Sequence, residues 1–330
     1  MKNNKNINKF NNSASSFMYP NLRAVSTSTS CFNGTRLNSW FVTGFVDAEG
    51  CFTVGIIQSK KAKLGWEVQP TFKLELHLKD LPLLEQIQAY LGGVGSITKQ
   101  GKDKVMLRVR SLSVLSVIVA NFDKFPLVTQ KRADFELFKR VLEAMDRKEH
   151  LTSEGLQNIV NIRASINNGL SADLKAAFPN TVAVPRPLVV DSEITDPNWL
   201  AGFAAGEGCF QIGIYKAKTN IGYAVTLRFK LSQHSRDTQL MESLVEYLGC
   251  GAYYYSTPDQ NVGDFVVKKY LDLTEKIIPF FTRYPIQGVK ALDFEDFKKA
   301  AELMKNKEHL TELGLEEIRL IQMGMNRGRE

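Results

Sequence analysis

The feature that most constrains this chain is an internal repeat. Residues 41–52 (FVTGFVDAEGCF) match residues 199–210 (WLAGFAAGEGCF), and later segments match in the same order at a nearly constant separation. The further pairs are 72–80 with 229–237, 90–92 with 247–249, 131–135 with 290–294, and 148–152 with 307–311. A repeat that extends this far predicts two copies of one fold.

The repeat divides the 330 residues into four segments, which we expect to be a tail (1–37), a first repeat (38–170), a linker (171–195) and a second repeat (196–330). The linker has three prolines and no hydrophobic period, as expected for a crossing segment. Asp196 and Pro197 then form a helix start, with Asp as the cap and Pro as the first helical residue. Asn38 or Ser39 should cap the first repeat in the same way.

The start of the chain differs in composition from the rest. Its first 46 residues contain no Asp or Glu, are rich in Asn and Ser, and carry the basic residues Lys2, Lys5, Lys9, Arg23 and Arg36. This composition is typical of an organellar transit peptide. It is equally typical of a low-complexity tail without an address, and neither interpretation makes it part of the folded core.

Charge and cysteine content restrict the function only loosely. Lys and Arg number 42 against 35 Asp and Glu, an excess that suits a polyanionic partner without specifying one. The four cysteines form no CxxC pair, which argues against a zinc site and a disulfide framework and favours a reducing compartment. No apolar run approaches the roughly 18 residues needed to span a bilayer.

Within each repeat, hydrophobic periodicity predicts the order αββαββα, an α+β fold. The opening helix ends near Glu49 or Glu207, and an alternating strand follows at once. A glycine turn, a second strand and a helix capped by Asp80 or Asp237 come next. Two short strands follow, at about 94–99 and 104–110 or 252–257 and 264–269, before the closing helices.

Each sheet must bury one face under its helices, which leaves a second, polar face open. Side chains of this kind can reach base edges in a major groove as well as phosphates, although an ordinary solvated face would carry similar residues. The open faces are expected to present Lys73, Glu75, His77, Arg108 and Arg110 in the first repeat, and Gln211, Tyr215, Arg228, Lys230, Ser232 and Lys268 in the second.

The two opening helices share a small-residue spacing that predicts their contact. Gly44 and Ala48 lie four residues apart, as do Gly202 and Gly206, and small residues at this spacing let helix backbones approach closely. The helix ends then place Glu49 beside Glu207, where two carboxylates repel each other. A divalent cation would relieve that repulsion, with the carbonyls of Ala48 and Gly206 as further ligands, and could activate water toward a phosphodiester.

Residues 42–50 and 200–208 resemble the two motifs of a single-chain LAGLIDADG homing endonuclease, and the resemblance extends from about residue 38 to 326. It implies two pseudo-symmetric repeats forming a saddle-shaped monomer that clasps double-stranded DNA over about two helical turns. It also implies Mg²⁺-dependent cleavage of both strands to leave 3′ overhangs, with Mn²⁺ or Ca²⁺ able to occupy the same sites. Members of the family are commonly encoded in organellar introns, so a mitochondrial location is expected.

The resemblance assigns metal binding to Glu49 and Glu207 and a catalytic role to Lys131 and Lys290, although these lysines could instead be surface caps. Asp47, which is Ala205 in the second motif, is expected to serve the end of its own helix.

His77 and His234 could be DNA contacts, turn residues or bases. Gln233 is a weak candidate for positioning water, because its counterpart is Leu76. The strands after the motifs add further expected DNA contacts: Cys51, Thr53, Gly55, Ile57, Cys209 and Gly213.

Two other functions occur among proteins of this architecture: an RNA maturase that helps introns splice, and a DNA-binding relative that does not cut. The presence of an acid at both motif ends favours cleavage, because a chain that does not cut has no need of two carboxylates there. Activity on intron RNA in addition to DNA stays open. The target sequence is not predicted, because base recognition depends on geometry and DNA deformability.

Overall fold

The computed structural model describes residues 37–190, 193–255 and 261–329, so the expected tail lies outside the described residues except for Leu37. The order αββαββα is confirmed in both repeats, called here the first half (37–170) and the second half (196–329). The first half contains α1 (Ser39–Glu49), β1 (Gly50–Gln58), β2 (Trp66–His77), α2 (Leu81–Tyr90), β3 (Ser96–Gln100), β4 (Lys104–Val109), α3 (Leu112–Lys124), α4 (Lys131–Asp146) and α5 (Ser153–Arg163).

The second half repeats these elements after a short helix, α6 (Ala172–Ala177). No helix of the described segments is long and apolar enough to cross a membrane. The elements of the second half are α7 (Pro197–Glu207), β5 (Gly208–Lys216), β6 (Tyr223–His234), α8 (Thr238–Leu248), β7 (Ala252–Tyr255), β8 (Val262–Val267), α9 (Tyr270–Asp272), α10 (Ile278–Arg283), α11 (Lys290–Lys305) and α12 (Glu312–Met323).

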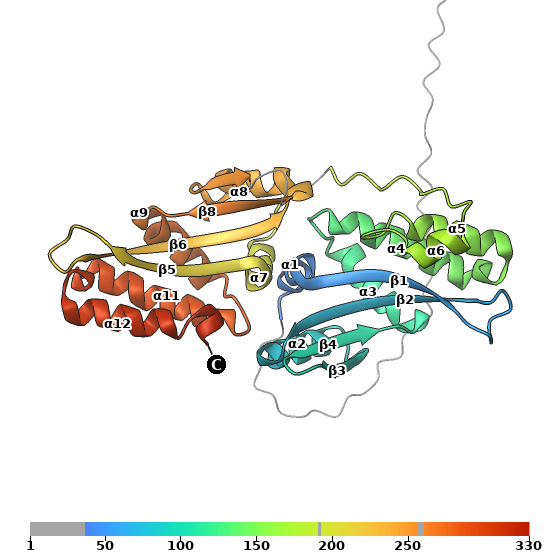
Figure 1. Cartoon of the computed structure of the whole chain (residues 1–330), viewed down its shortest axis with the longest axis horizontal. Coiled ribbons are helices and arrows are strands. Elements are labelled where there is room, and N and C mark those ends of the chain that lie inside the picture. Colours follow the sequence, from blue (N-terminus) through green and yellow to red (C-terminus); the bar gives the residue numbers. More distant parts are fainter. Residues whose placement is uncertain (1–36, 191–192, 256–260, 330) are drawn as a thin grey trace, which may run out of the picture. The chain divides into compact units, whose positions relative to one another are not determined.

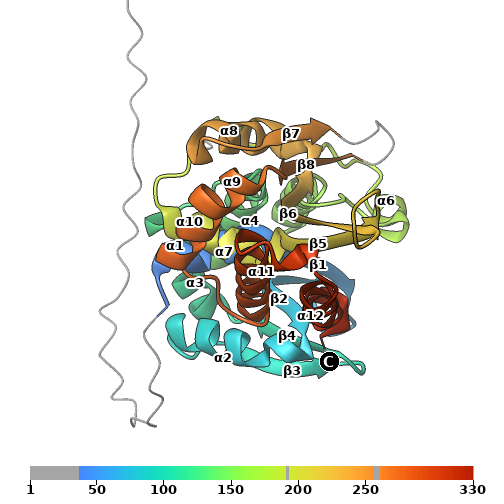
Figure 2. The ribbon, with the colours of Figure 1, turned by 90° about the vertical axis from the view of Figure 1, so that its left-hand side faces the viewer.

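Each half forms a four-stranded antiparallel sheet, with strand orders β1-β2-β4-β3 and β5-β6-β8-β7. One face of each sheet is covered by helices: α4 packs on β1 and β2, and α11 packs on β5 (Figure 1). At the far strands, α2 lies beside β4 and α8 beside β7 and β8 (Figure 2). Phe52 and Phe210 occupy equivalent positions in the two cores, each surrounded by four other phenylalanine rings within 6 Å.

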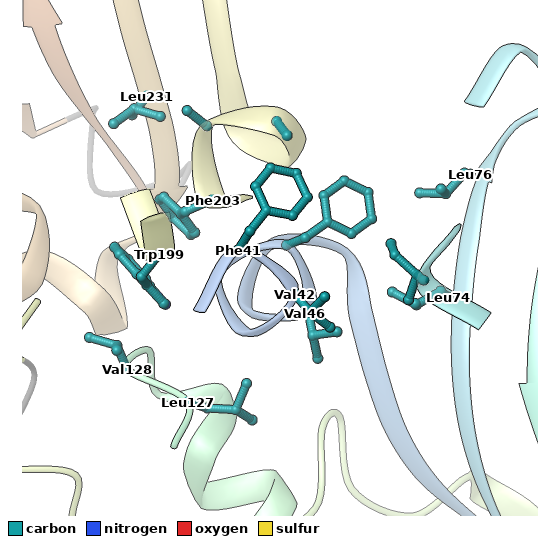
Figure 3. Close-up of a cluster of buried hydrophobic side chains, with 14 of the residues drawn as sticks. Phe41, Val42, Val46, Leu74, Leu76, Leu127, Val128, Trp199, Phe203 and Leu231 are labelled. Carbon is teal, nitrogen blue, oxygen red and sulfur yellow. The ribbon is translucent and has the colours of Figure 1, made fainter. Parts of the chain in front are cut away.

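Helices α1 and α7 pack against each other and join the halves (Figure 1). Both expected caps form, since Asn38 Oδ1 accepts from Trp40 N at 2.8 Å and Asp196 Oδ1 accepts from Asn198 N at 2.8 Å. Figure 3 shows Phe41 of α1 in one buried cluster with Trp199 and Phe203 of α7. Buried side chains of the two opening helices therefore pack together as part of the core.

Two predicted strand boundaries are wrong. Strand β4 ends at Val109 because Ser111 occupies the N-cap position of α3, so Arg110 lies beyond the sheet. Strand β8 begins at Val262 and ends at Val267, and Lys268 therefore lies just past it, before the N-cap residue of α9. Arg110 and Lys268 would lie on the open faces if their strands continued, but each lies one residue beyond the end of its strand.

The segment expected to be a crossing linker contains regular structure. Its helix α6 is capped by Ser171, whose Oγ accepts from Leu174 N at 3.4 Å, and Leu174 is buried. Further along, Val184 N donates to Asn161 O of α5 at 3.3 Å, so this stretch runs against the first half. A helix of only six residues gives too short a pattern for its period to be recognised in the sequence.

Candidate active site

The ends of α1 and α7 meet because glycine removes the side chain where the backbones are closest. A Cβ atom on Gly44 would overlap the Trp199 carbonyl, and a Cβ atom on Gly202 would overlap the Phe41 carbonyl. At Gly206 a Cβ atom would overlap Ala48 Cβ and lie 3.1 Å from Glu49 Cγ. The predicted glycine-mediated contact is therefore confirmed, and it places the Glu49 side chain against the last turn of α7.

Glu49 and Glu207 are the final residues of their helices, and their environments oppose ionisation. Burial, and next the charge of Glu49, raises the pKa of Glu207 to about 7. Burial also raises the pKa of Glu49, while the nearby ammonium groups of Lys290 and Lys131 act in the opposite direction. Crowded carboxylates of this kind bind a proton or a cation more readily than isolated ones.

Two lysines at the first positions of α4 and α11 point to the same helix ends. Lys131 Nζ donates to Val46 O and to Ala48 O, both at 3.0 Å. Lys290 Nζ donates to Gly206 O. Burial lowers the pKa of both lysines, and the surrounding carboxylates partly restore it. The four expected catalytic side chains thus converge from four helices, although the two carbonyls expected as metal ligands accept from these lysines here.

Asp47 does not serve the end of its own helix, so that prediction is wrong. Its Oδ2 accepts from Val128 N at 2.8 Å and from Trp199 Nε1 at 2.7 Å. Its Oδ1 accepts from Thr129 N at 3.2 Å and from Thr129 Oγ1 at 2.6 Å. A buried carboxylate needs such donors, and these hold the segment before α4 while linking the first half to α7. Ala205 offers no equivalent acceptor in the second half.

The open sheet faces carry most of the residues expected there. In the first sheet Lys73 lies opposite both Cys51 and Arg108, and in the second Gln211 lies opposite Arg228. Thr53, Gly55, Ile57 and Glu75 share the first face by alternation, and Cys209, Gly213, Tyr215, Lys230 and Ser232 share the second. The same alternation, carried along every strand, would have added further residues, among them Glu67, Gln69, Thr71, Ser96, Thr98, Gln100, Lys104, Met106, Thr226, Tyr254 and Asp264.

Several side chains on these faces are already paired with each other. Lys104 lies 2.7 Å from Glu75, and Arg228 Nε donates to Gln211 Oε1 at 2.6 Å. Asp264 accepts from Ser232 Oγ at 2.7 Å and lies 3.3 Å from Lys230 Nζ. Pairs of this kind hold long side chains in defined directions, which lowers the ordering cost of recognising a ligand. A hollow of about 510 Å³ lies beside Gln211, Arg228 and Lys268.

The two matched histidines are turn residues. His77 Nδ1 accepts from Lys79 N at 3.2 Å, and His234 Nδ1 accepts from Arg236 N at 3.1 Å, so each ring caps the short turn after its strand. Gln233 is held by its neighbour, since its Oε1 accepts from His234 N at 3.0 Å. The Lys-Glu-His-Leu-Thr blocks are also turns: Thr152 Oγ1 accepts from Gly155 N and starts α5.

The expected helix caps at Asp80 and Asp237 have a different role from the predicted one. Both residues occupy N-cap positions of α2 and α8, but neither side chain accepts a bond from its own helix. Asp80 Oδ1 accepts instead from Val289 N at 2.8 Å, and Asp237 Oδ1 accepts from Gln130 N at 2.6 Å. Each carboxylate therefore reaches the other half, and no local sequence signal marks such a contact.

Two matched α+β units that bring a pair of carboxylates and a pair of lysines between polar sheets define a duplicated, nuclease-like class of protein. The family described as LAGLIDADG endonuclease matches residues 42–142 and 200–301. The chain belongs to the LAGLIDADG endonuclease family.

Among proteins with curated descriptions, the chain is similar to two from Neurospora crassa. Probable intron-encoded endonuclease 3 is 41% identical over 88% of this chain, and probable intron-encoded endonuclease 2 is 41% identical over 90%. The chain spans 55% and 66% of the lengths of these two relatives. A protein in ND4 intron 1 of Podospora anserina is 47% identical over 36% of this chain and 26% of its own length.

Among solved structures, the chain is similar to the LAGLIDADG homing endonuclease I-SmaMI bound to cleaved DNA. The TM-score is 0.87 at 46% sequence identity, covering 89% of this chain and 98% of that one. The same enzyme bound to an uncleaved DNA target in the presence of calcium ions gives a TM-score of 0.87, covering 88% of this chain and all of that one. Both comparisons confirm the α+β architecture of two four-stranded sheets with helices.

Proposed function

We propose that this chain is a site-specific double-strand DNA endonuclease of the homing type. The observation that carries the proposal is the meeting of Glu49 and Glu207 at the ends of α1 and α7, where each half supplies one carboxylate. A single composite centre between two sheets suits a duplex, because each sheet can contact one half of a long target. The solved relative bound to cleaved DNA supports this proposal.

The carboxylate pair fits a divalent cation. Within the described ranges, no group of three or more His, Cys, Asp or Glu side chains could hold a metal by itself. Two acidic side chains and the carbonyls of Ala48 and Gly206 nevertheless form a set of hard oxygen donors, which suits Mg²⁺ with water and phosphate as the remaining ligands. We assign Mg²⁺ to Glu49 and Glu207, with Mn²⁺ or Ca²⁺ able to bind there, and calcium accompanies the uncleaved complex of the solved relative.

When bound, the cation supplies charge stabilisation to the phosphodiester and acidifies water. The chain's own groups then have distinct tasks. Glu49 and Glu207 place negative charge at a buried position. Without a counter-charge this is unfavourable, as the raised pKa of Glu207 indicates. Lys131 and Lys290, held at the same helix ends, place positive charge where the phosphate oxygens would gain negative charge in the reaction.

The solved relative contains a pair of lysines with the same spacing. Its structure has been determined with two lysines replaced by alanine, and those lysines are as far apart in sequence as Lys131 and Lys290 are here. If the two lysines were surface caps, their ammonium groups would be exposed. Both lysines are instead buried, and burial lowers the pKa of each. We therefore keep both lysines in the proposed centre.

The open sheet faces are the proposed DNA interface, covering about two helical turns by a single chain. The paired positions Gln211–Arg228 and Lys73–Arg108 are well placed for base edges, and the remaining basic residues suit phosphates. His77 is the least favoured of the proposed contacts, because its ring already caps a turn. We place the two DNA-binding repeats at residues 38–170 and 196–330, joined by residues 171–195.

We infer cleavage of both strands to leave 3′ overhangs, and action as a monomer, because one chain contains both halves of the centre. The intron-encoded relatives, one of them in an ND4 intron, support a mitochondrial location. The retained acids at both motif ends favour cleavage over a binding-only role.

A cleavage selection tests this function. Purified protein is incubated with plasmids that carry randomised inserts, with Mg²⁺ or with EDTA, and linear products are sequenced at their ends. We expect Mg²⁺-dependent enrichment of one sequence family, with both strands cut and 3′ overhangs. Enrichment of bound but uncut inserts in Mg²⁺ would instead identify a non-cleaving DNA-binding protein.

A further inference from the structure

The turns that follow β2 and β6 are matched in sequence, yet the proposed chemistry does not use them. Residues 77–80 read His-Leu-Lys-Asp and residues 234–237 read His-Ser-Arg-Asp. In each, the histidine Nδ1 accepts from the amide two residues later, which fixes the turn. The aspartate at the end of each turn is thereby presented away from the helix that it precedes.

Both aspartates cross to the other half. Asp80 of the first half accepts from Val289 N, the N-cap amide of α11, and Asp237 of the second half accepts from Gln130 N, the N-cap amide of α4. The next residues are Lys290 and Lys131, the first of their helices. An anionic acceptor at a helix N-terminus satisfies a free amide and complements the helix dipole.

Other contacts of the same turns also cross between the halves. Arg236 Nη1 lies 3.8 Å from Asp134 Oδ2 of α4. Lys79 Nζ donates to the backbone carbonyl of Arg329, whose side chain donates to Asp293 of α11. The contacts of Asp80 and Asp237 are equivalent in the two halves, which argues against an accidental contact at one position. Each turn docks on the helix that carries the opposite lysine.

We infer that Asp80 and Asp237 are crossed positioning residues: Asp80 sets the helix start that carries Lys290, and Asp237 sets the one that carries Lys131. The inference rests on the proposed role of the two lysines in cleavage. It means that each half supplies a carboxylate to the helix start that carries the other half's lysine, so complete positioning of both lysines requires the halves to be docked.

The two crossed contacts differ in redundancy. The start of α4 is also held by Thr129, whose Oγ1 accepts from Lys131 N at 3.2 Å and donates to Asp47. At the start of α11 the corresponding residues are Gly288 and, in the second motif, Ala205, which cannot make these bonds. Loss of Asp80 should therefore have a larger effect than loss of Asp237.

Strand-resolved cleavage tests the inference, using the target from the selection with a different label on each strand. Lys290→Met and Lys131→Met first identify which strand each lysine serves. We expect Asp80→Ala to slow the strand that Lys290→Met slows by about fivefold, since a lost cap costs about 1 kcal/mol and 1.36 kcal/mol is tenfold in rate. Asp237→Ala should slow the other strand by less, about threefold.

Asparagine keeps an acceptor oxygen, so Asp80→Asn and Asp237→Asn should recover most of the rate, whereas a purely charge-based effect would leave them as slow as alanine. The control is Asp103→Ala, an exposed carboxylate near the same turn, which should cut like the unmodified protein. Slowing of the strand on the same side as the aspartate, or equal slowing of both strands, would overturn the crossed assignment.

A second measurement needs no DNA. Amide hydrogen exchange should speed up at Val289 but not at Gln130 in Asp80→Ala, and at Gln130 but not at Val289 in Asp237→Ala. If the unmodified protein does not cut, the proposed function fails; if the lysine variants cut at the normal rate, the proposed role of the lysines fails. In either case exchange still tests the positioning contacts. Unchanged exchange at both amides would refute the inference itself.

Discussion

Replacing Glu207 by glutamine should stabilise the metal-free protein at high pH. The folded protein raises the pKa of this carboxyl from 4.5 to about 7, chiefly by burial and then by the charge of Glu49. Between these two values the folded state keeps the proton and the unfolded state has lost it, so the free energy of unfolding falls as pH rises. Above pH 7 the full cost is present, about 3 kcal/mol.

Glutamine removes this ionisation but its buried amide still requires hydrogen bonds, so we expect a gain of roughly 2 kcal/mol at pH 8. The gain should shrink as pH falls and disappear at about pH 5, because the ionisation cost of Glu207 has there fallen to the size of the cost of the buried amide. Urea unfolding in EDTA at several pH values measures it. Glu49→Gln should show the same sign. A difference that does not depend on pH, or a variant that is less stable at pH 8, would refute the electrostatic account of the site.

Three further changes test other parts of the structure. Gly202→Ala should lower the free energy of unfolding by about 3 kcal/mol or more, because the new methyl group overlaps the Phe41 carbonyl. The control is Gly55→Ala, whose methyl group makes only ordinary contacts and should cost less; urea unfolding compares the two variants. Trp199→Phe removes the indole donor to Asp47 and should lower the free energy of unfolding by about 1–3 kcal/mol in the same assay; an unchanged free energy of unfolding would show that this hydrogen bond does not stabilise the fold. Arg228→Gln should weaken binding to the selected target and change base preference at one position, as read from a repeated selection; uniform weakening across all sequences would assign Arg228 to phosphate contact instead.

The fold could be predicted because its information is local and present twice. Alternation in β1 and β5, the caps at Asn38 and Asp196, and the glycine spacing of the opening helices each act over a few residues. The meeting of Glu49 and Glu207 followed from that spacing, since backbones that approach at Gly44 and Gly202 leave the helix ends side by side.

The parts that sequence reasoning missed depend on contacts between distant residues. Asp80 and Asp237 stand where a helix cap is expected, and nothing nearby reveals that their partners are amides of the other half. Asp47 misled in the same way, because its donors include Trp199 of the second half. Buried carboxylates take whichever donors the tertiary fold provides, so their partners require the folded arrangement.

The most direct test of the central claim is the pair of variants Glu49→Gln and Glu207→Gln on the selected DNA target. The composite centre predicts that either substitution abolishes double-strand cleavage in Mg²⁺, because each half contributes one of two required carboxylates. Binding to the same target, measured in Ca²⁺, should change little, since the sheets are untouched. Full cleavage by either variant would contradict a centre shared between the two halves.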